Sequence, residues 1–75
     1  MIIKILGSGC RKCVALADNA KAAAQAAGKP AEIVKVTDFA EIAAYGVMST
    51  PALVVDEKLL STGKVLSADE IGRLL

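Results

Sequence analysis

The chain has 75 residues, a formal net charge of +1 and a hydrophobic content of 55%. This length suits one small domain, residues 1–75, and the apolar content excludes a disordered chain. The near-neutral charge, with lysines spread along the sequence, gives no reason to expect nucleic acid or a membrane surface as the partner. No stretch is apolar for long enough to cross a bilayer, and the first six residues are too short for the core of a signal peptide, so we expect a cytoplasmic protein.

The first predicted element is an apolar strand over Met1–Leu6. Isoleucines fall on both of its faces, which is typical of a central strand that is covered on both sides. Gly7-Ser8-Gly9 then turns the chain, and we expect Ser8 or Gly9 to be the N-cap of the helix that follows.

The only two cysteines, Cys10 and Cys13, follow this turn at the start of that helix. Residues three apart are neighbours on a helix, so two thiols at this C-x-x-C spacing are able to form a redox-active disulfide. The helix N-terminus and the two cationic residues between the cysteines, Arg11 and Lys12, favour thiolate over thiol. We therefore predict that Cys10 is the attacking thiolate and that Cys13, one turn further along, is the more buried resolving thiol.

A helix is predicted over residues 10–27, because this alanine-rich sequence has high helix propensity. Gly28 suits the position after the last helical residue, and Pro30 prevents the helix from continuing. A strand is predicted over Ala31–Val36, where charged side chains within the apolar run indicate a sheet edge. The strand-helix-strand order implies a parallel pair with a right-handed connection. The apolar stripe of the helix repeats every three or four residues and consists of Cys13, Leu16, Ala20, Ala23 and Ala27.

A short second helix is predicted to begin after Asp38, which has Glu41 three residues on, as in an acidic variant of the capping box. Gly46 ends this helix. Its expected apolar positions are Phe39, Ile42 and Ala43.

The next predicted strand, Ala52–Val55, carries no charge and should be buried on both faces. Asp56 and Glu57 turn the chain into a hairpin partner over Lys58–Thr62, and Gly63 ends it. The capping box Ser67-Ala68-Asp69-Glu70 opens a final helix. The apolar side of that helix is expected to consist of Ile71, Leu74 and Leu75.

The predicted order β-α-β-α-β-β-α describes an α/β domain. The first and third strands are the most apolar and should be central, which gives a mixed four-stranded sheet in the order 2-1-3-4 with helices on both faces. This arrangement resembles the thioredoxin fold, because the dithiol follows the first strand and Thr50-Pro51 precedes the third.

Over its whole length the chain resembles the short thioredoxin-like, or glutaredoxin-like, redox-active disulfide proteins of bacteria and archaea. The resemblance implies that Cys10 and Cys13 form the active-site disulfide, with Cys10 as the nucleophile. It also implies a cis peptide bond at Pro51, which would shape the substrate groove and keep metal ions off the thiols. Thr50 would offer backbone hydrogen bonds to a bound substrate strand. The segments that carry the resemblance are Lys4–Cys13, Val36–Asp38, Tyr45–Asp56 and Gly63–Ser67.

The chain departs from thioredoxins at two places. Thioredoxins carry aromatic and Gly-Pro residues around their cysteines, whereas this chain has the dipeptide Arg11-Lys12, which we expect to contact substrate. Thioredoxins also carry a buried acidic residue six positions before the first cysteine, as proton acceptor for the resolving thiol, and that position here is Lys4. Tyr45, the only tyrosine, either lies near the sulfurs or packs at the surface as a helix-end residue.

We therefore expect a thiol-disulfide oxidoreductase that uses the dithiol to reduce or exchange disulfides in a protein partner. It would be a monomer, would need no cofactor beyond its own disulfide, and would receive electrons from a reductase or a small dithiol. Two other classes remain open. One is a copper or zinc carrier, although a chain without histidine would need other ligands for a four-coordinate zinc site. The other is an interaction module that holds a peptide between Cys10 and Pro51.

Overall fold

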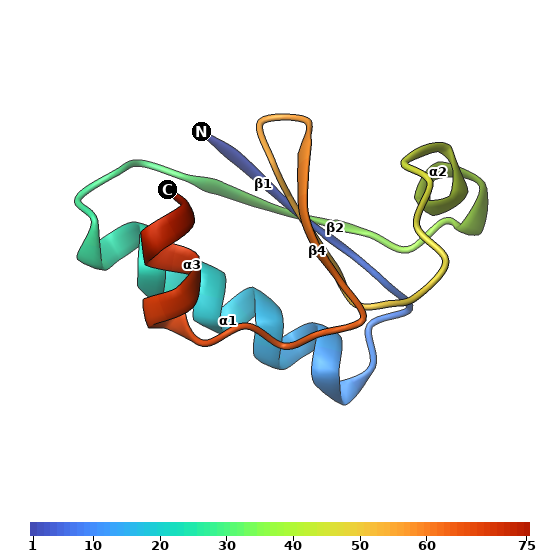
Figure 1. Cartoon of the computed structure of the whole chain (residues 1–75), viewed down its shortest axis with the longest axis horizontal. Helices are drawn as coiled ribbons and strands as arrows, with labels where there is room; N and C mark the ends of the chain where they lie inside the picture. Colours follow the sequence, from blue (N-terminus) through green and yellow to red (C-terminus); the bar gives the residue numbers. More distant parts are fainter.

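The computed structural model describes residues 1–75, and its elements follow the predicted order. The strands form one sheet in the order β2-β1-β3-β4, with β1 parallel to β2, β1 antiparallel to β3, and β3 antiparallel to β4. The predicted thioredoxin-like topology is therefore confirmed (Figure 1). The elements are β1 Ile2–Leu6, α1 Arg11–Ala26, β2 Glu32–Val36, α2 Phe39–Ala44, β3 Ala52–Val55, β4 Lys58–Thr62 and α3 Ala68–Leu74.

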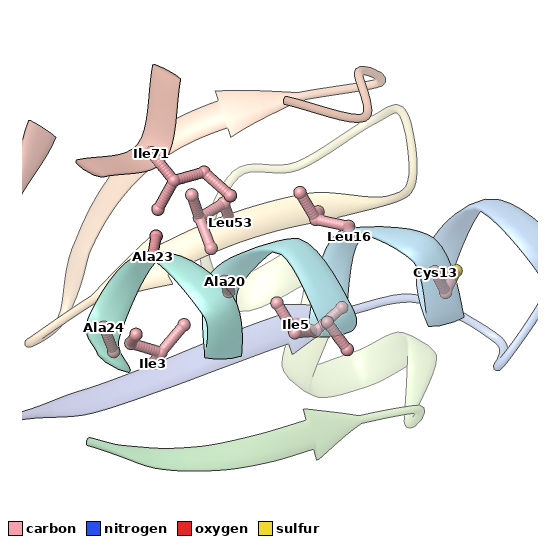
Figure 2. Close-up of a cluster of buried hydrophobic side chains, with 10 residues drawn as sticks. Ile3, Ile5, Cys13, Leu16, Ala20, Ala23, Ala24, Leu53 and Ile71 are labelled. Atoms are coloured by element: carbon pink, nitrogen blue, oxygen red, sulfur yellow. The ribbon is translucent and has the colours of Figure 1, made fainter. Parts of the chain in front are cut away.

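Helices α1 and α3 pack together against one face of the sheet (Figure 1). Because side chains alternate along a strand, Ile3 and Ile5 of β1 both reach this face. Figure 2 shows them beneath α1, with Leu53 of β3 and Ile71 of α3 completing the cluster. The small alanine side chains of α1 let the helix lie close to the sheet. Its buried residues are Cys13, Leu16, Ala17, Ala20, Ala23 and Ala24.

The opposite face of the sheet is covered by α2 and the loop that follows it. Ile42 is the one buried residue of this short helix, and Tyr45 at its C-terminal end packs against the same cluster. Lys4 of β1 lies between Ile3 and Ile5 and therefore points to this second face. The buried residues here are Leu6, Val36, Ile42, Val47, Ala52 and Val54.

The two ends of α1 compare differently with prediction. The prediction of Ser8 or Gly9 as N-cap is wrong, because Cys10 has the extended backbone of the N-cap and its carbonyl accepts the Val14 N–H at 3.0 Å. The predicted stop at Gly28 is confirmed. Gly28 has a φ of 66°, and the next N–H, of Lys29, donates to the Ala24 carbonyl at 3.0 Å, as in a Schellman motif. Ala27, the last residue of the predicted apolar stripe, is exposed at this turn.

The shorter helices also differ from prediction in detail. Asp38 caps α2 by accepting the Ala40 N–H at 3.1 Å, but the Glu41 carboxylate does not accept the Asp38 N–H, so the capping box is incomplete. Phe39 is 77% exposed and Ala43 is exposed, because so short a helix turns only Ile42 fully into the core. In α3 the predicted capping box is present and Ile71 is buried, whereas Leu74 is exposed.

The β3–β4 hairpin turns through Asp56 and Glu57, which both have positive φ, at 48° and 67°. Positive φ at both central residues is the requirement of a type I′ turn, whose twist matches that of the flanking strands. Asp56 also anchors the turn to β1, since its Oδ1 accepts the Ile2 N–H and its own N–H donates to the Ile2 carbonyl, both at 2.9 Å.

Both chain termini lie beside the turn between α1 and β2 (Figure 1). The Met1 ammonium donates to the Pro30 carbonyl, and Lys29 Nζ donates to the Leu75 carbonyl at 2.8 Å. This places the termini at the end of the sheet where β1 begins. No helix combines the length and the apolarity that a membrane crossing requires.

Candidate active site

The two cysteines lie at the end of the sheet where β1 finishes. Because β2 is parallel to β1 and β3 is antiparallel, the C-terminal end of β2 and the N-terminal end of β3 meet at this same end. The Gly7 N–H extends the β1–β2 ladder by donating to the Val36 carbonyl at 2.9 Å. The topology thus brings the dithiol, the start of α2 and the Thr50-Pro51 loop to one end of the molecule.

The Cys10 and Cys13 sulfurs are 2.9 Å apart, within hydrogen-bond distance, and both cysteines are free thiols in the structure. Their environments differ. Cys10 is exposed, whereas Cys13 is 4% exposed and belongs to the core beneath α1 (Figure 2). One thiol is therefore open to a partner, and the other is accessible mainly to its neighbour.

The pKa values of the two thiols move in opposite directions. The pKa of Cys10 is lowered, first by the hydrogen bond from the Cys13 thiol and then by the Cys13 backbone N–H. The pKa of Cys13 is raised, first by burial and then by its hydrogen bond with Cys10. The main causes at Cys10 are hydrogen bonds at the start of the helix rather than the charges of Arg11 and Lys12, whose side chains are exposed and form no ion pair.

Gly7 is where the parts of this end of the molecule come closest together. A Cβ added to Gly7 would overlap Cys13 Sγ and would lie 3.7 Å from the Thr50 Cβ. Only a residue without a side chain allows the Cys13 sulfur and the Thr50 loop to approach β1 in this way. Pro51, which follows Thr50 through a cis peptide bond, is buried, whereas Thr50 itself is exposed.

Thr50 has free main-chain groups. Neither its N–H nor its carbonyl takes part in a hydrogen bond within the chain, whereas the neighbouring Pro51 carbonyl accepts the Gly63 N–H at 2.8 Å. Met48, two residues earlier in the same loop, is 99% exposed. The loop therefore offers both unpaired backbone and apolar surface at the dithiol end.

Lys4 takes part in a network on the opposite face of the sheet from Cys13. Its ammonium donates to the Tyr45 hydroxyl at 2.8 Å and pairs with the Glu57 carboxylate, which also accepts the Tyr45 O–H at 3.0 Å. The hydrogen bonds to Glu57 and then to Tyr45 raise the pKa of Lys4, and the bond from Lys4 lowers the pKa of Glu57. Lys4 is therefore held as an ammonium and cannot take the proton of Cys13. Of the two positions that the sequence left open for Tyr45, the one near the sulfurs is not observed, because the Tyr45 hydroxyl bonds to Lys4 and Glu57 and not to a sulfur.

A small pocket of about 50 Å³ lies beside Cys13. Lys35 contributes to it because the β1–β2 register pairs Lys35 with Ile5, which points to the α1 face. Sequence reasoning used Lys35 only as a sign of a sheet edge and missed Glu57 as a partner of Lys4. The lining residues of the pocket are Ile5, Gly7, Gly9, Cys13, Val14, Lys35 and Thr37.

Possible metal ligands do not gather anywhere in this structure. No three side chains of the types His, Cys, Asp and Glu come together. The Cys10–Cys13 pair thus has no third ligand from its own chain, and a four-coordinate zinc site would need ligands from elsewhere.

The model of the thioredoxin domain family matches residues 1–75, the whole of this chain. The chain belongs to the thioredoxin family. A protein named thioredoxin from Methanocaldococcus jannaschii is 44% identical over 71 residues, which cover 95% of this chain and 81% of that protein. Another protein named thioredoxin, from Methanothermobacter thermautotrophicus, is 37% identical over 75 residues, which cover 100% of this chain and 97% of that protein. With its adjacent Cys10 and Cys13, this thioredoxin-family protein is a thiol-disulfide oxidoreductase.

Proposed function

We propose that this thioredoxin-family protein reduces disulfides in a protein partner with the Cys10–Cys13 dithiol. The observation that carries the proposal is the asymmetry of the pair: an exposed Cys10 of lowered pKa lies 2.9 Å from a buried Cys13 of raised pKa. The thiolate is the reactive form in disulfide exchange, so the exposed thiol is also the one prepared to attack.

The reaction takes two exchange steps. In the first, the Cys10 thiolate attacks one sulfur of the partner disulfide; a Cys10–partner bond forms, the partner S–S bond breaks, and the other partner sulfur leaves as a thiolate that takes up a proton. In the second, Cys13 loses its proton and attacks Cys10 Sγ, forming the Cys10–Cys13 disulfide and releasing the second partner thiol. Two electrons pass from the dithiol to the partner.

The proton of Cys13 needs a route that does not use Lys4, since Lys4 is already protonated and lies on the other face of the sheet. The pocket of about 50 Å³ beside Cys13 does not supply one, because its surface is almost wholly apolar and offers a water no set of polar partners. The partner thiolate that leaves as Cys13 attacks Cys10 Sγ is itself a base and would take up the proton.

The partner would lie across the loop that leads to Pro51. The unpaired N–H and carbonyl of Thr50 support this position, because an extended segment on either side of the partner disulfide is able to pair with them like an added strand. Pro51 would shape the groove beneath that segment. Arg11 and Lys12, which are exposed and directly follow Cys10, would contact the same partner.

The remaining parts of the proposal follow from this chemistry. Residues 1–75 act as a single thioredoxin-like domain and as a monomer. The protein uses no cofactor beyond its own disulfide, because both electrons come from the two thiols. A reductase or a small dithiol must return the disulfide to the dithiol, and the cytoplasm is the reducing compartment in which this electron transfer would run.

The two cysteine variants test the proposal and serve as controls for each other. Cys10→Ser should abolish reduction of a disulfide-linked peptide, whereas Cys13→Ser should accumulate a mixed disulfide between Cys10 and the peptide. Mass spectrometry after acid quenching would detect the added peptide mass. A Cys10→Ser protein that retains full reductase activity would overturn the proposal, as would a wild-type protein that forms no intramolecular disulfide at any redox potential.

A further inference from the structure

Two cations occupy the first turn of α1, where they are electrostatically unfavourable. Arg11 and Lys12 directly follow Cys10, and this first turn holds no acidic residue. The N-terminus of a helix carries partial positive charge, so it favours carboxylates and disfavours cations. Neither side chain has a carboxylate partner, since the one ion pair of the protein joins Lys4 to Glu57. Along α1 the nearest carboxylate is that of Asp18, about 10 Å further up the helix axis from Arg11.

Two further lysines lie at the same end of the molecule. Lys35 lines the pocket beside Cys13. Lys64 follows Gly63, whose N–H bonds to the Pro51 carbonyl, but it has a counter-charge: the pKa of Glu70 is lowered by hydrogen bonds with Ser67 and then by the charges of Arg73 and Lys64. We call three of these cations the basic rim: Arg11, Lys12 and Lys35. Lys64 is left out because Glu70 lies near it.

No carboxylate forms an ion pair with the basic rim. The Asp38 carboxylate accepts the Ala40 N–H at the start of α2 and forms no ion pair. Glu41 faces the cleft that contains Lys4, on the other face of the sheet. The loop before Pro51, at the same end of the molecule, is uncharged: Met48 is almost fully exposed and the Thr50 main chain is unpaired.

We infer that the partner of this protein carries acidic residues on both sides of the disulfide that is reduced. This inference rests on the proposed function and specifies its substrate class. Arg11 and Lys12 directly follow the exposed Cys10 and have no carboxylate partner, and Lys35 lies at the same end of the sheet. A partner with carboxylates beside its disulfide would neutralise these cations on docking. Charge complementarity of this kind accelerates encounter and rejects partners of the wrong sign, and salt weakens both effects.

The test compares two synthetic peptides that differ only in charge. Each contains one intramolecular disulfide, flanked by Asp in one peptide and by Lys in the other. Rates of reduction are measured at about 0.01 M and about 1 M salt, where the Debye length is about 30 Å and about 3 Å. We expect the Asp peptide to react at least about 10-fold faster than the Lys peptide at low salt, and the two rates to converge at high salt.

Charge reversal at the basic rim provides the matched variants. Arg11→Glu combined with Lys12→Glu should reverse the preference, and it should also fold well because carboxylates are favourable in the first turn of a helix. Lys21→Glu combined with Lys58→Glu makes the same change in net charge at exposed positions away from the dithiol, and should leave the preference unchanged. Alkylation of Cys10 by neutral iodoacetamide measures the reactivity of the thiol itself.

The outcomes separate this inference from the proposed function. Equal rates for both peptides, or a faster Lys peptide, would overturn the inference while leaving a working reductase. The inference also fails if the Arg11→Glu, Lys12→Glu substitutions slow iodoacetamide alkylation of Cys10 by the same factor as they slow the reduction of each peptide. The cations would then act on the thiol and not on the partner. If the wild-type protein reduces neither peptide nor a small uncharged disulfide, the proposed function itself is wrong.

Discussion

Replacing Gly7 by alanine tests how closely the parts of the active site are packed. The added Cβ would overlap Cys13 Sγ and would also lie 3.6 Å from the Cys13 Cβ and 3.7 Å from the Thr50 Cβ. Gly7 is not among the residues with positive φ, so alanine is free to adopt its backbone conformation. The expected effect therefore comes from contact and not from the backbone.

The size of the effect follows from two opposing contributions. Overpacking a tight site costs about 1–3 kcal/mol, and the reduced flexibility of the unfolded chain offsets about 0.4–1 kcal/mol of this. We expect a net loss of about 1–2 kcal/mol in the free energy of unfolding of Gly7→Ala, which corresponds to a fall in Tm of about 4–8 °C per kcal/mol for a domain of this size. The overlap could also be relieved by rotation of the Cys13 side chain, which would move Sγ away from Cys10 and slow formation of the disulfide.

The assay is urea unfolding of the reduced protein together with the rate at which the Cys10–partner mixed disulfide is resolved. Gly72→Ala is the control, because a Cβ there meets nothing within 4 Å and Gly72 lies inside α3. The free energy of unfolding of Gly72→Ala should rise by about 0.5–1 kcal/mol, since glycine is unfavourable within a helix. If Gly7→Ala matches the wild type in both stability and resolution rate, the close approach of Cys13 to β1 is not a constraint on this site.

Three further predictions concern the thiols, the ion pair and a helix cap. Iodoacetamide should modify Cys10 well before Cys13 near neutral pH, because the pKa of Cys10 is lowered and that of Cys13 is raised; equal rates by mass spectrometry would contradict the assigned roles. Glu57→Gln should destabilise the protein at neutral pH, and its difference from the wild type should shrink as pH falls below about 4.3, since a carboxyl of lowered pKa contributes stability above its unfolded pKa and loses it in acid. A difference that persists unchanged in acid titration would rule out the ion pair as its cause. Ser67→Ala should cost about 0.5–2 kcal/mol by removing the acceptor of the Glu70 N–H. Its control, Ser61→Ala, removes a buried hydroxyl without a hydrogen-bond partner and should not destabilise.

Several parts of the fold were predictable because their signals are local. The capping box of Ser67 and Glu70 and the glycine stop at Gly28 each depend on spacing within a single helix end. The central position of β1 followed from its apolar residues on both faces. The exposure of Phe39 was not predictable from periodicity, because the orientation of a short helix is set by contacts such as those of Ile42 with the sheet, and its own pattern covers less than two turns.

In the candidate site, too, the parts that depend on local spacing were predictable and the parts that depend on distant contacts were not. The pairing of Cys10 with Cys13 depends on a three-residue spacing that any helix brings together, so the sequence predicted it. The network of Lys4 with Tyr45 and Glu57 joins residues that are 41 and 53 positions apart, and no spacing rule covers such contacts. The place of Lys35 beside Cys13 likewise depends on the register between two strands, which the sequence alone did not give.

The shared position of the two termini has a practical consequence for handling the protein. Met1 and Leu75 both lie beside Lys29 and Pro30, at the opposite end of β1 from Cys10. An affinity tag, a fluorescent domain or a surface tether joined to either terminus would therefore leave the exposed thiol facing solution. Cys13→Ser protein immobilised through its C-terminus should act as bait that captures partners covalently and releases them with a reducing agent.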